Sequence, residues 1–299
     1  MVPEKFIFVL TPIKTANANN LAKIFYNDHM KIYTLLLVIF LTGCAAPPTS
    51  QTAAKYGFNK NFIKTNTFTL ASYQKILQPG KSVNIYVEGD GNAWASRYKV
   101  SDDPSPRTGT TMLLAALDHN PNVVYLARPC QYSPQDLKTI CDSKYWSIAR
   151  YSETVVESIS VAIDSIKQQC QAPQINLIGY SGGGALVVLV SARRNDIASI
   201  RTVAGNLDLT TMDEIHDTTP LSESLDPISV AQKVKNIPQL HFVGSKDHIV
   251  PVEIATNFVK AAGLNLNKVI VLKGANHNNI WHEHWERLLQ YAMSTASND

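Results

Sequence analysis

The sequence predicts an α/β fold in which helices cover a mostly parallel sheet. From about residue 67 onward, short runs rich in Val, Ile and Leu alternate with stretches of helical periodicity. The chain has 299 residues, of which 45% are hydrophobic and 17% charged, so it can bury a large core. Alternation of this kind over a chain of this size is typical of a sheet whose parallel strands are connected by helices.

The expected elements follow one another in a regular order. The strands are predicted at 67–76, which we expect to form an edge, and at 82–87, 122–127, 175–179, 200–204, 239–244 and 268–272. The helices are predicted at 110–118, 152–170, 182–193, 252–262 and 280–295. In 152–170, apolar residues recur every three or four positions, which indicates one buried helix face.

Two segments interrupt the alternation. Residues 94–109 follow the end of a strand and contain two prolines near their middle, and residues 206–230 are polar and separate two strands. Long irregular segments within a domain are usually functional. We therefore expect both segments to form walls, or a small lid insertion, over the site.

The N-terminal region has the form of a signal peptide. Lys31 follows Met30 and precedes an apolar run at 32–41, which is about half of the roughly 20 residues that a membrane-spanning helix needs. A signal that begins at Met30 predicts that translation starts there, in place of Met1; a long, atypical leader is the alternative. We divide the chain into a leader and signal peptide at 1–43, a flexible tether at 44–60, and a folded domain at 61–299.

The end of the signal segment, Leu41-Thr42-Gly43-Cys44, resembles the lipobox of bacterial lipoproteins. The resemblance implies cleavage before Cys44 and attachment of lipid to it, which would hold the protein at a membrane of the bacterial cell envelope. Ala45 stands where inner-membrane lipoproteins often have Asp, which favours the outer membrane or the periplasmic face. A plain secretory signal and a short anchor helix are the alternatives.

Charge and cysteine content narrow the chemistry further. The net charge is +3 and no basic block occurs, so nothing favours nucleic-acid binding. In an exported protein Cys130 and Cys141 are candidates for a disulfide across a short loop, whereas Cys170 is expected to be an unpaired thiol. No CxxC or HExxH spacing occurs, and we expect no metal and no organic cofactor.

A serine in a glycine-rich turn is the central motif. Residues 179–184 read Gly-Tyr-Ser-Gly-Gly-Gly, between an apolar strand and an apolar helix. Strand, sharp turn and helix are the context in which G-x-S-x-G forms a nucleophile elbow, and the helix N-terminus favours negative charge there. The motif predicts that Ser181 is a nucleophile; the alternative is a glycine-rich turn with an incidental serine.

The expected chain order then requires an acid and a histidine after the serine. Asp247 follows one predicted strand and His277 follows the next, both at the edge of the sheet where open parallel sheets bind ligands. Asp208 is an alternative acid, because it follows the strand before that of Asp247. His241 lies inside a strand and is expected to be structural. The histidines His248, His282 and His284 are weaker candidates for the base.

These motifs resemble the α/β-hydrolase family. The family typically has Gly-x-x-Asp-x-x-Val-Pro around the acid and Gly-x-x-His at the base, and both occur here, at 244–251 and 274–277. The resemblance covers roughly residues 82–295. It implies an α/β-hydrolase fold, with a mostly parallel central sheet, helices on both faces and a small lid, in which Ser181, Asp247 and His277 form a catalytic triad.

The resemblance also implies an oxyanion hole. One N–H donor should come from Gly182 and the other from the loop after an early strand, where Asp90 or Gly91 is the candidate. Many family members have His-Gly in that loop, whereas this chain has Glu88-Gly-Asp90. Glu88 and Asp90 are expected either to pair with Arg107, Arg128 or Arg150, or to bind a cationic substrate.

The sequence therefore predicts a membrane-anchored serine hydrolase, similar to esterases and lipases, which cleaves a small carboxylic ester through an acyl-enzyme. A thioester or an amide is also compatible with the triad. One alternative is a non-catalytic surface lipoprotein that uses the fold for binding. Another is an acyltransferase or a peptidase with the same triad.

Overall fold

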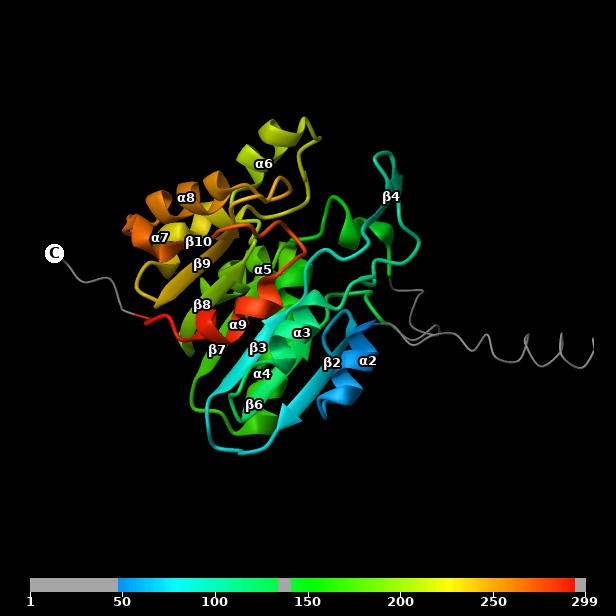
Figure 1. Cartoon of the computed structure of the whole chain (residues 1–299). Coiled ribbons are helices and arrows are strands. Elements are labelled where there is room, and N and C mark those ends of the chain that lie inside the picture. The colour runs from blue at the N-terminus through cyan, green and yellow to red at the C-terminus, as the bar shows by residue number, and fades with distance from the viewer. Residues whose placement is uncertain (1–47, 134–140, 294–299) are drawn as a thin grey trace, which may run out of the picture. The chain divides into compact units, whose positions relative to one another are not determined.

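The folded part of the protein is built on an eight-stranded sheet. The computed structural model describes residues 48–133 and 141–293 (Figure 1). The strands lie in the order β1-β2-β6-β3-β7-β8-β9-β10. Their bounds are Asn59–Lys64 (β1), Thr69–Ile76 (β2), Val83–Val87 (β3), Asn122–Leu126 (β6), Ile175–Tyr180 (β7), Ile197–Val203 (β8), Gln239–Gly244 (β9) and Val269–Leu272 (β10).

The sheet is mostly parallel, as the sequence predicts. The six neighbouring strands β6-β3-β7-β8-β9-β10 are parallel to one another. Strand β2 is antiparallel to both of its neighbours, β1 and β6. Every residue of β3, β6 and β9 is buried. Strands that are buried throughout need cover on both faces, which explains why they appear in the sequence as unbroken apolar runs.

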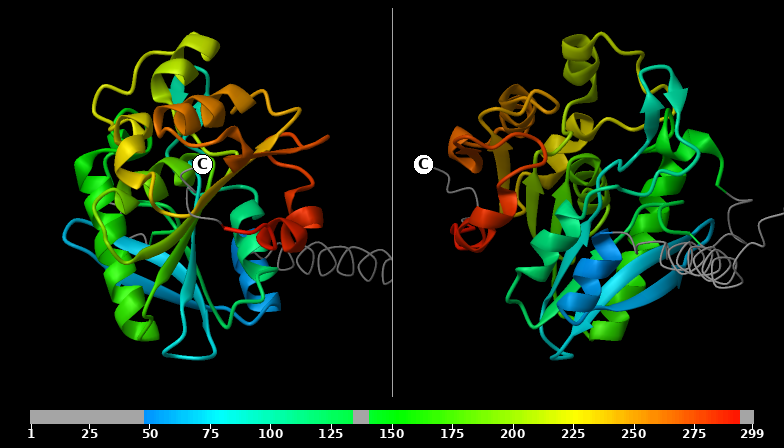
Figure 2. Two further views of the ribbon diagram at one scale, coloured as in Figure 1. Left: turned by 90° about the vertical axis from the view of Figure 1, so that its left-hand side faces the viewer. Right: turned by 45° about the vertical axis from the view of Figure 1, so that its right-hand side comes forward.

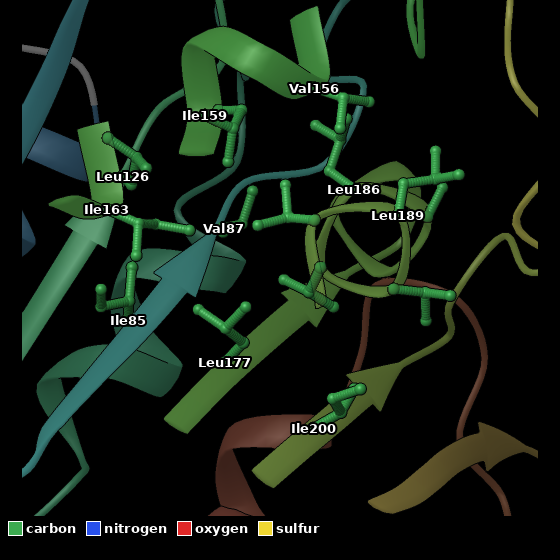
Figure 3. Close-up of a cluster of buried hydrophobic side chains, with 14 of the residues drawn as sticks. Ile85, Val87, Leu126, Val156, Ile159, Ile163, Leu177, Leu186, Leu189 and Ile200 are labelled. Atoms are coloured by element: carbon green, nitrogen blue, oxygen red, sulfur yellow. The ribbon is translucent and has the colours of Figure 1, made fainter. Parts of the chain in front are cut away.

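Helices supply that cover on both faces (Figures 1 and 2). One apolar cluster packs α4 (Glu153–Cys170), α5 (Gly182–Ser191), α7 (Ala231–Val234) and α8 (Val252–Ala261) against the sheet. A second cluster contains α2 (Pro48–Lys55), α3 (Thr110–Ala116) and α9 (Trp281–Leu289). Short 3-10 helices lie at Ser143–Trp146, Pro227–Val230 and Leu266–Lys268. Figure 3 shows side chains of β3, β7 and β8 meeting those of α4 and α5 in the first cluster.

The first cluster packs around the turn between β7 and α5, which contains Ser181. Leu177 on β7 and Leu186 on α5 are both fully buried, and they flank the turn that joins these two elements (Figure 3). The α4 residues that predict a buried face, such as Val156, Ile159 and Ile163, pack against this pair of elements. Because side chains in a protein core are closely packed, these contacts fix the turn between β7 and α5.

The expected tether at 44–60 is wrong for the residues that the structure describes. Residues 48–55 form α2, and residues 59–64 form β1. Thr49 and Ala53 are buried, and the Thr49 hydroxyl lies 2.8 Å from that of Tyr132. Small polar residues gave no apolar stripe that would predict this helix. Met30 and Cys44 lie outside the described residues.

The prediction that the strand at 67–76 forms an edge of the sheet is also wrong. β2 lies inside the sheet, because β1 pairs along its outer side. Five of the six residues of β1 are exposed and only Ile63 is buried. Two lysines and two asparagines make this strand look like a loop in the sequence, although charged residues on an edge strand protect it from pairing with other chains.

Residues 94–109 and 206–230 contain more regular structure than expected. The first holds a hairpin of β4 (Trp94–Ser96) and β5 (Lys99–Val100), and the second holds α6 (Leu209–His216). Asp208 caps α6, because its carboxylate accepts a hydrogen bond from the Thr211 amide. At the other end of the chain, the helix predicted at 280–295 ends at Leu289.

A disulfide joins Cys130 to Cys141, the pair that the sequence leaves as a candidate, and Cys170 is a buried free thiol. The two half-cystines are 11 residues apart. Closing a loop of this length stabilises the folded state by about 2–3 kcal/mol in the chain-entropy model.

We expect the C130S/C141S double variant to lose this amount of unfolding free energy, measured in urea. A reductant should lower the stability of the wild type but not that of the double variant. Equal stability of both proteins under oxidising conditions would contradict a stabilising bond.

Candidate active site

Ser181 lies in a strained turn between β7 and α5. Its backbone dihedrals are φ 50° and ψ −122°, in a region that a side chain rarely occupies. Such strain costs on the order of 1–3 kcal/mol and persists where the surroundings enforce it. Here the Ser181 amide donates to the Val203 carbonyl, while its own carbonyl accepts from Gly184 and Asn206. The turn that the motif predicts is therefore present and held on both sides.

Two glycines of the motif are required by close backbone approach. A Cβ on Gly179 would overlap the Gly183 carbonyl, and one on Gly183 would overlap the carbonyl of Val87, at the end of β3. Strand β7, helix α5 and the loop after β3 consequently meet at van der Waals distance. The glycines bring this loop next to the serine.

The structure brings the three residues predicted as a triad together. Nε2 of His277 lies 3.0 Å from Oγ of Ser181, and Nδ1 of His277 lies 2.9 Å from Oδ2 of Asp247. Asp247 follows β9 and His277 follows β10, so both side chains reach the serine from the carboxyl ends of parallel strands. These distances suit proton transfer between serine and histidine.

Further contacts fix the acid and the histidine. Oδ1 of Asp247 accepts hydrogen bonds from the amides of Ile249 and Val250, each 2.9 Å long, which leaves Oδ2 for the histidine. The His277 carbonyl accepts hydrogen bonds from the Tyr180 hydroxyl and from the Trp281 indole, both 2.9 Å long. Trp281 lies outside the sequence motifs of the site, and Tyr180 occupies a variable position of G-x-S-x-G, so the motifs predict neither contact.

The alternative residues have other roles. Asp208 caps α6 and accepts a hydrogen bond from Asn257. His241 is fully buried between Thr202 and Gln239, and burial lowers its pKa to about 3, so it is structural, as expected. His248 and His282, two of the weaker candidates for the base, are exposed.

The loop after β3 lies next to Ser181 and Gly182. Gly89 touches the serine itself, since a Cβ placed on it would lie 3.1 Å from Cβ of Ser181. The Asp90 carboxylate lies against Cα of Gly182, whereas Gly91 packs on the Pro104 carbonyl and on Gln131. The Gly89 amide is occupied, because it donates to Oε1 of Glu88. Of the two candidates in this loop, Asp90 is therefore the one that borders Gly182.

Glu88 has a structural role. It is 3% exposed, and its carboxylate accepts hydrogen bonds from the hydroxyls of Thr111 and Tyr125 and from the Gly89 amide. Burial raises the pKa of this carboxyl group, and the hydrogen bonds counteract that effect. Glu88 thus ties the loop to α3 and β6 and is not available to a substrate.

Asp90 is held by two arginines. Its carboxylate pairs with Arg128, and Nη1 of Arg150 donates to its Oδ2 over 2.9 Å. The Tyr151 hydroxyl donates to the same carboxylate over 3.1 Å. Burial by itself would raise the pKa of Asp90, but Arg128 and Arg150 outweigh it and hold the pKa at about 2. Arg107, the third candidate partner, is exposed.

The depressed pKa of Asp90 predicts a pH effect on stability. Its ordinary pKa is 3.8, so the ionised carboxylate stabilises the fold fully above about pH 5, and this contribution is lost as the pH falls from about 4 towards 2. The D90N variant should be less stable than the wild type in urea unfolding at pH 7. The difference should shrink at pH 3, whereas D102N, at an exposed carboxylate, should behave as the wild type does. An equal deficit at both pH values would contradict the assignment.

A cavity of about 550 Å³ lies beside the site. The β4–β5 hairpin and α6, which Figure 1 shows on the same side of the domain, both contribute to its lining, as expected for the two interrupting segments. Arg150 and Asn206 connect the cavity to the site, since Arg150 binds Asp90 and the Asn206 amide donates to the Ser181 carbonyl. A cavity of this size accommodates a small organic substrate.

The described residues contain neither a candidate metal site nor a helix that could span a membrane. Residues 48–133 and 141–293 contain no group of three or more His, Cys, Asp or Glu side chains placed to hold a metal ion. Within the same ranges, no helix combines the length and the apolar character that crossing a membrane requires.

Known proteins resemble the chain in fold. No family model and no curated sequence matches it. An esterase of Pyrococcus furiosus has a TM-score of 0.54 and 16% identity, over 81% of this chain and 94% of that one. Est1E of Butyrivibrio proteoclasticus has a TM-score of 0.54 and 14% identity, over 77% and 98%. The acylaminoacyl peptidase of Pyrococcus horikoshii has a TM-score of 0.56 and 14% identity, over 81% of this chain and 43% of the peptidase. The protein has the α/β-hydrolase fold.

Proposed function

We propose that the protein is a serine hydrolase that cleaves a carboxylic ester. The observation that carries the proposal is the continuous line of hydrogen-bond distances from Ser181 through His277 to Asp247. It is the arrangement that activates a serine, because the histidine can take the hydroxyl proton while the carboxylate orients the ring. The folds of an esterase and of a peptidase support hydrolysis of an acyl bond in general.

In the proposed reaction, His277 accepts the Ser181 proton as Oγ attacks the substrate carbonyl. His277 then donates this proton to the leaving alcohol, and an acyl-enzyme remains. Water, deprotonated by His277, attacks the acyl-enzyme, and the proton returns to Ser181 as the carboxylic acid leaves. Asp247 holds the ring with Nδ1–H towards itself and stabilises the imidazolium.

The backbone amides of Gly182 and Asp90 are the proposed oxyanion donors. Gly182 is the first residue of α5, and the first amides of a helix have no acceptor within the helix. Asp90 borders Gly182 through its side chain, which Arg128 and Arg150 hold in place. The nearby carboxylate does not oppose the oxyanion, because the two guanidinium groups more than balance its charge.

Hydrolysis of matched substrates tests the proposal. Esters, thioesters and amides with the same short acyl group should be compared on the full-length protein, with release of the acid measured directly. We expect the ester to be cleaved at a higher kcat/KM than the amide. Faster cleavage of the amide would indicate a peptidase, and turnover of none of them on a folded protein would favour the non-catalytic alternative.

We also propose that Cys44 anchors the protein to a membrane of the bacterial cell envelope. The proposal is supported by the signal-type segment and by the lipobox resemblance at 41–44. Expression with a clickable fatty acid should label the wild type but not the C44S variant, and only the wild type should sediment with membranes. Equal labelling of both proteins would exclude Cys44 as the lipid site.

A further inference from the structure

Arg150, which lines the cavity, belongs to a side-chain cluster with an excess of positive charge. In this cluster Asp90 stands between Arg128 and Arg150, so two guanidinium groups face one carboxylate. The Asp90 carboxylate in turn lies against Gly182, the residue after the nucleophile. Asp90 therefore links the site to Arg150, which lines the cavity.

Arg150 is the arginine whose charge remains available. Arg128 is 3% exposed, binds Asp90, donates from Nη2 to the Arg150 carbonyl and lies over the Tyr151 ring. Arg150 lines the cavity. It donates from Nη1 to Asp90 and from Nε to the Ser147 carbonyl, and it also interacts with the Tyr151 hydroxyl. A guanidinium has five N–H donors in a fixed fork, so donors of Arg150 remain for a ligand.

The rest of the cavity suits a flexible apolar chain. Its lining includes Trp94, Ile148, Leu209, Met212 and Leu221. Arg97 lies on the hairpin wall and adds a second positive charge. Two carboxylates also line the cavity, those of Asp213 on α6 and of Asp217 directly after it. The Asp213 carboxylate accepts a hydrogen bond from the Thr218 hydroxyl.

We propose that Arg150 binds a carboxylate carried by the acyl group of the substrate. The inference rests on the proposed function and makes its substrate class narrower, namely esters of dicarboxylic acids in which one carboxyl group is free. Methylene groups of the acyl chain would pack on the apolar wall, while the free carboxylate would receive parallel N–H donors from the guanidinium. Such a ligand balances a partly buried charge that Asp90 leaves uncompensated.

Two esters with acyl chains of equal length test the inference. In p-nitrophenyl hemiadipate the chain ends in a carboxylate, and in p-nitrophenyl hexanoate it ends in a methyl group. We expect full-length wild-type protein to cleave the hemiadipate with a kcat/KM at least about tenfold higher, since hydrogen bonds to charged groups are the stronger kind. In R150Q, the ratio of kcat/KM for the hemiadipate to kcat/KM for the hexanoate should be close to one. R287Q removes an exposed charge on α9 and should keep the wild-type ratio.

The ratio is measured within each variant, so partial loss of folded protein does not change it. A wild-type ratio near one, or an R150Q ratio equal to that of the wild type, would overturn the inference and leave the proposed function intact. Failure to cleave either ester would count against the proposed function itself. If R150Q does not fold, product inhibition of the wild type decides: adipate should inhibit at least about tenfold more strongly than hexanoate, and equal inhibition would overturn the proposal.

Discussion

Replacing Ser181 with alanine should lower kcat by at least about 10⁴-fold, because the group that attacks the carbonyl is lost. The melting temperature should change little. The strained backbone of residue 181 is held by hydrogen bonds of its own amide and carbonyl, and these do not involve the hydroxyl. The measurement is ester turnover together with thermal unfolding of the same preparation.

Ser191 offers a matched control for this variant. It is a buried serine of α5 whose hydroxyl donates to the Val187 carbonyl within the helix, so S191A removes the same atom outside the site. We expect S191A to retain kcat within about threefold, since such a hydrogen bond contributes little to the site. Turnover by S181A at the level of S191A would exclude Ser181 as the nucleophile.

Replacing Asp247 with asparagine should lower kcat by about 10⁴-fold, with little change in the geometry of the site. The amides of Ile249 and Val250 require an oxygen at the position of Oδ1, so the asparagine would turn its NH₂ group towards His277. A donor there forces the ring proton onto Nε2, and the ring can then no longer accept the serine proton. The pH profile of kcat, measured beside the wild type, is the readout.

The alternative acid provides the control. Asp208 caps α6, and asparagine is as good a cap as aspartate, so D208N should keep the fold and most of the activity. We expect kcat of D208N within about threefold of the wild-type value. The opposite result, with D208N inactive and D247N active, would assign the acid to the loop after β8.

The parts of the fold that the sequence predicts are those with a strong apolar pattern. The buried strands β3, β6 and β9 and the helix α4 were expected within one or two residues of their bounds, because each has a core-facing pattern that only one element type satisfies. Strand β1 and helix α2 were missed. Their few buried residues, such as Ile63 and Ala53, depend on contacts with distant parts of the chain.

The site shows the same division. Ser181, Asp247 and His277 were expected together because each stands in a local motif at the end of a strand. Tyr151, which donates to Asp90, lies in no motif, and Tyr180, which donates to the His277 carbonyl, occupies a variable position of G-x-S-x-G, so neither role could be predicted. Arg128 and Arg150 pair with Asp90 and not with Glu88. This choice depends on the directions in which the side chains of Glu88 and Asp90 point after the end of β3. Only the three-dimensional structure determines that choice.

Covalent labelling with a fluorophosphonate probe, followed by peptide mass spectrometry, tests the central claim most directly, because the probe reacts only with an activated serine. We expect one adduct on full-length protein, at Ser181, and its loss in the H277A variant, in which the base is missing. Labelling of another serine, or equal labelling of the wild type and H277A, would contradict the account.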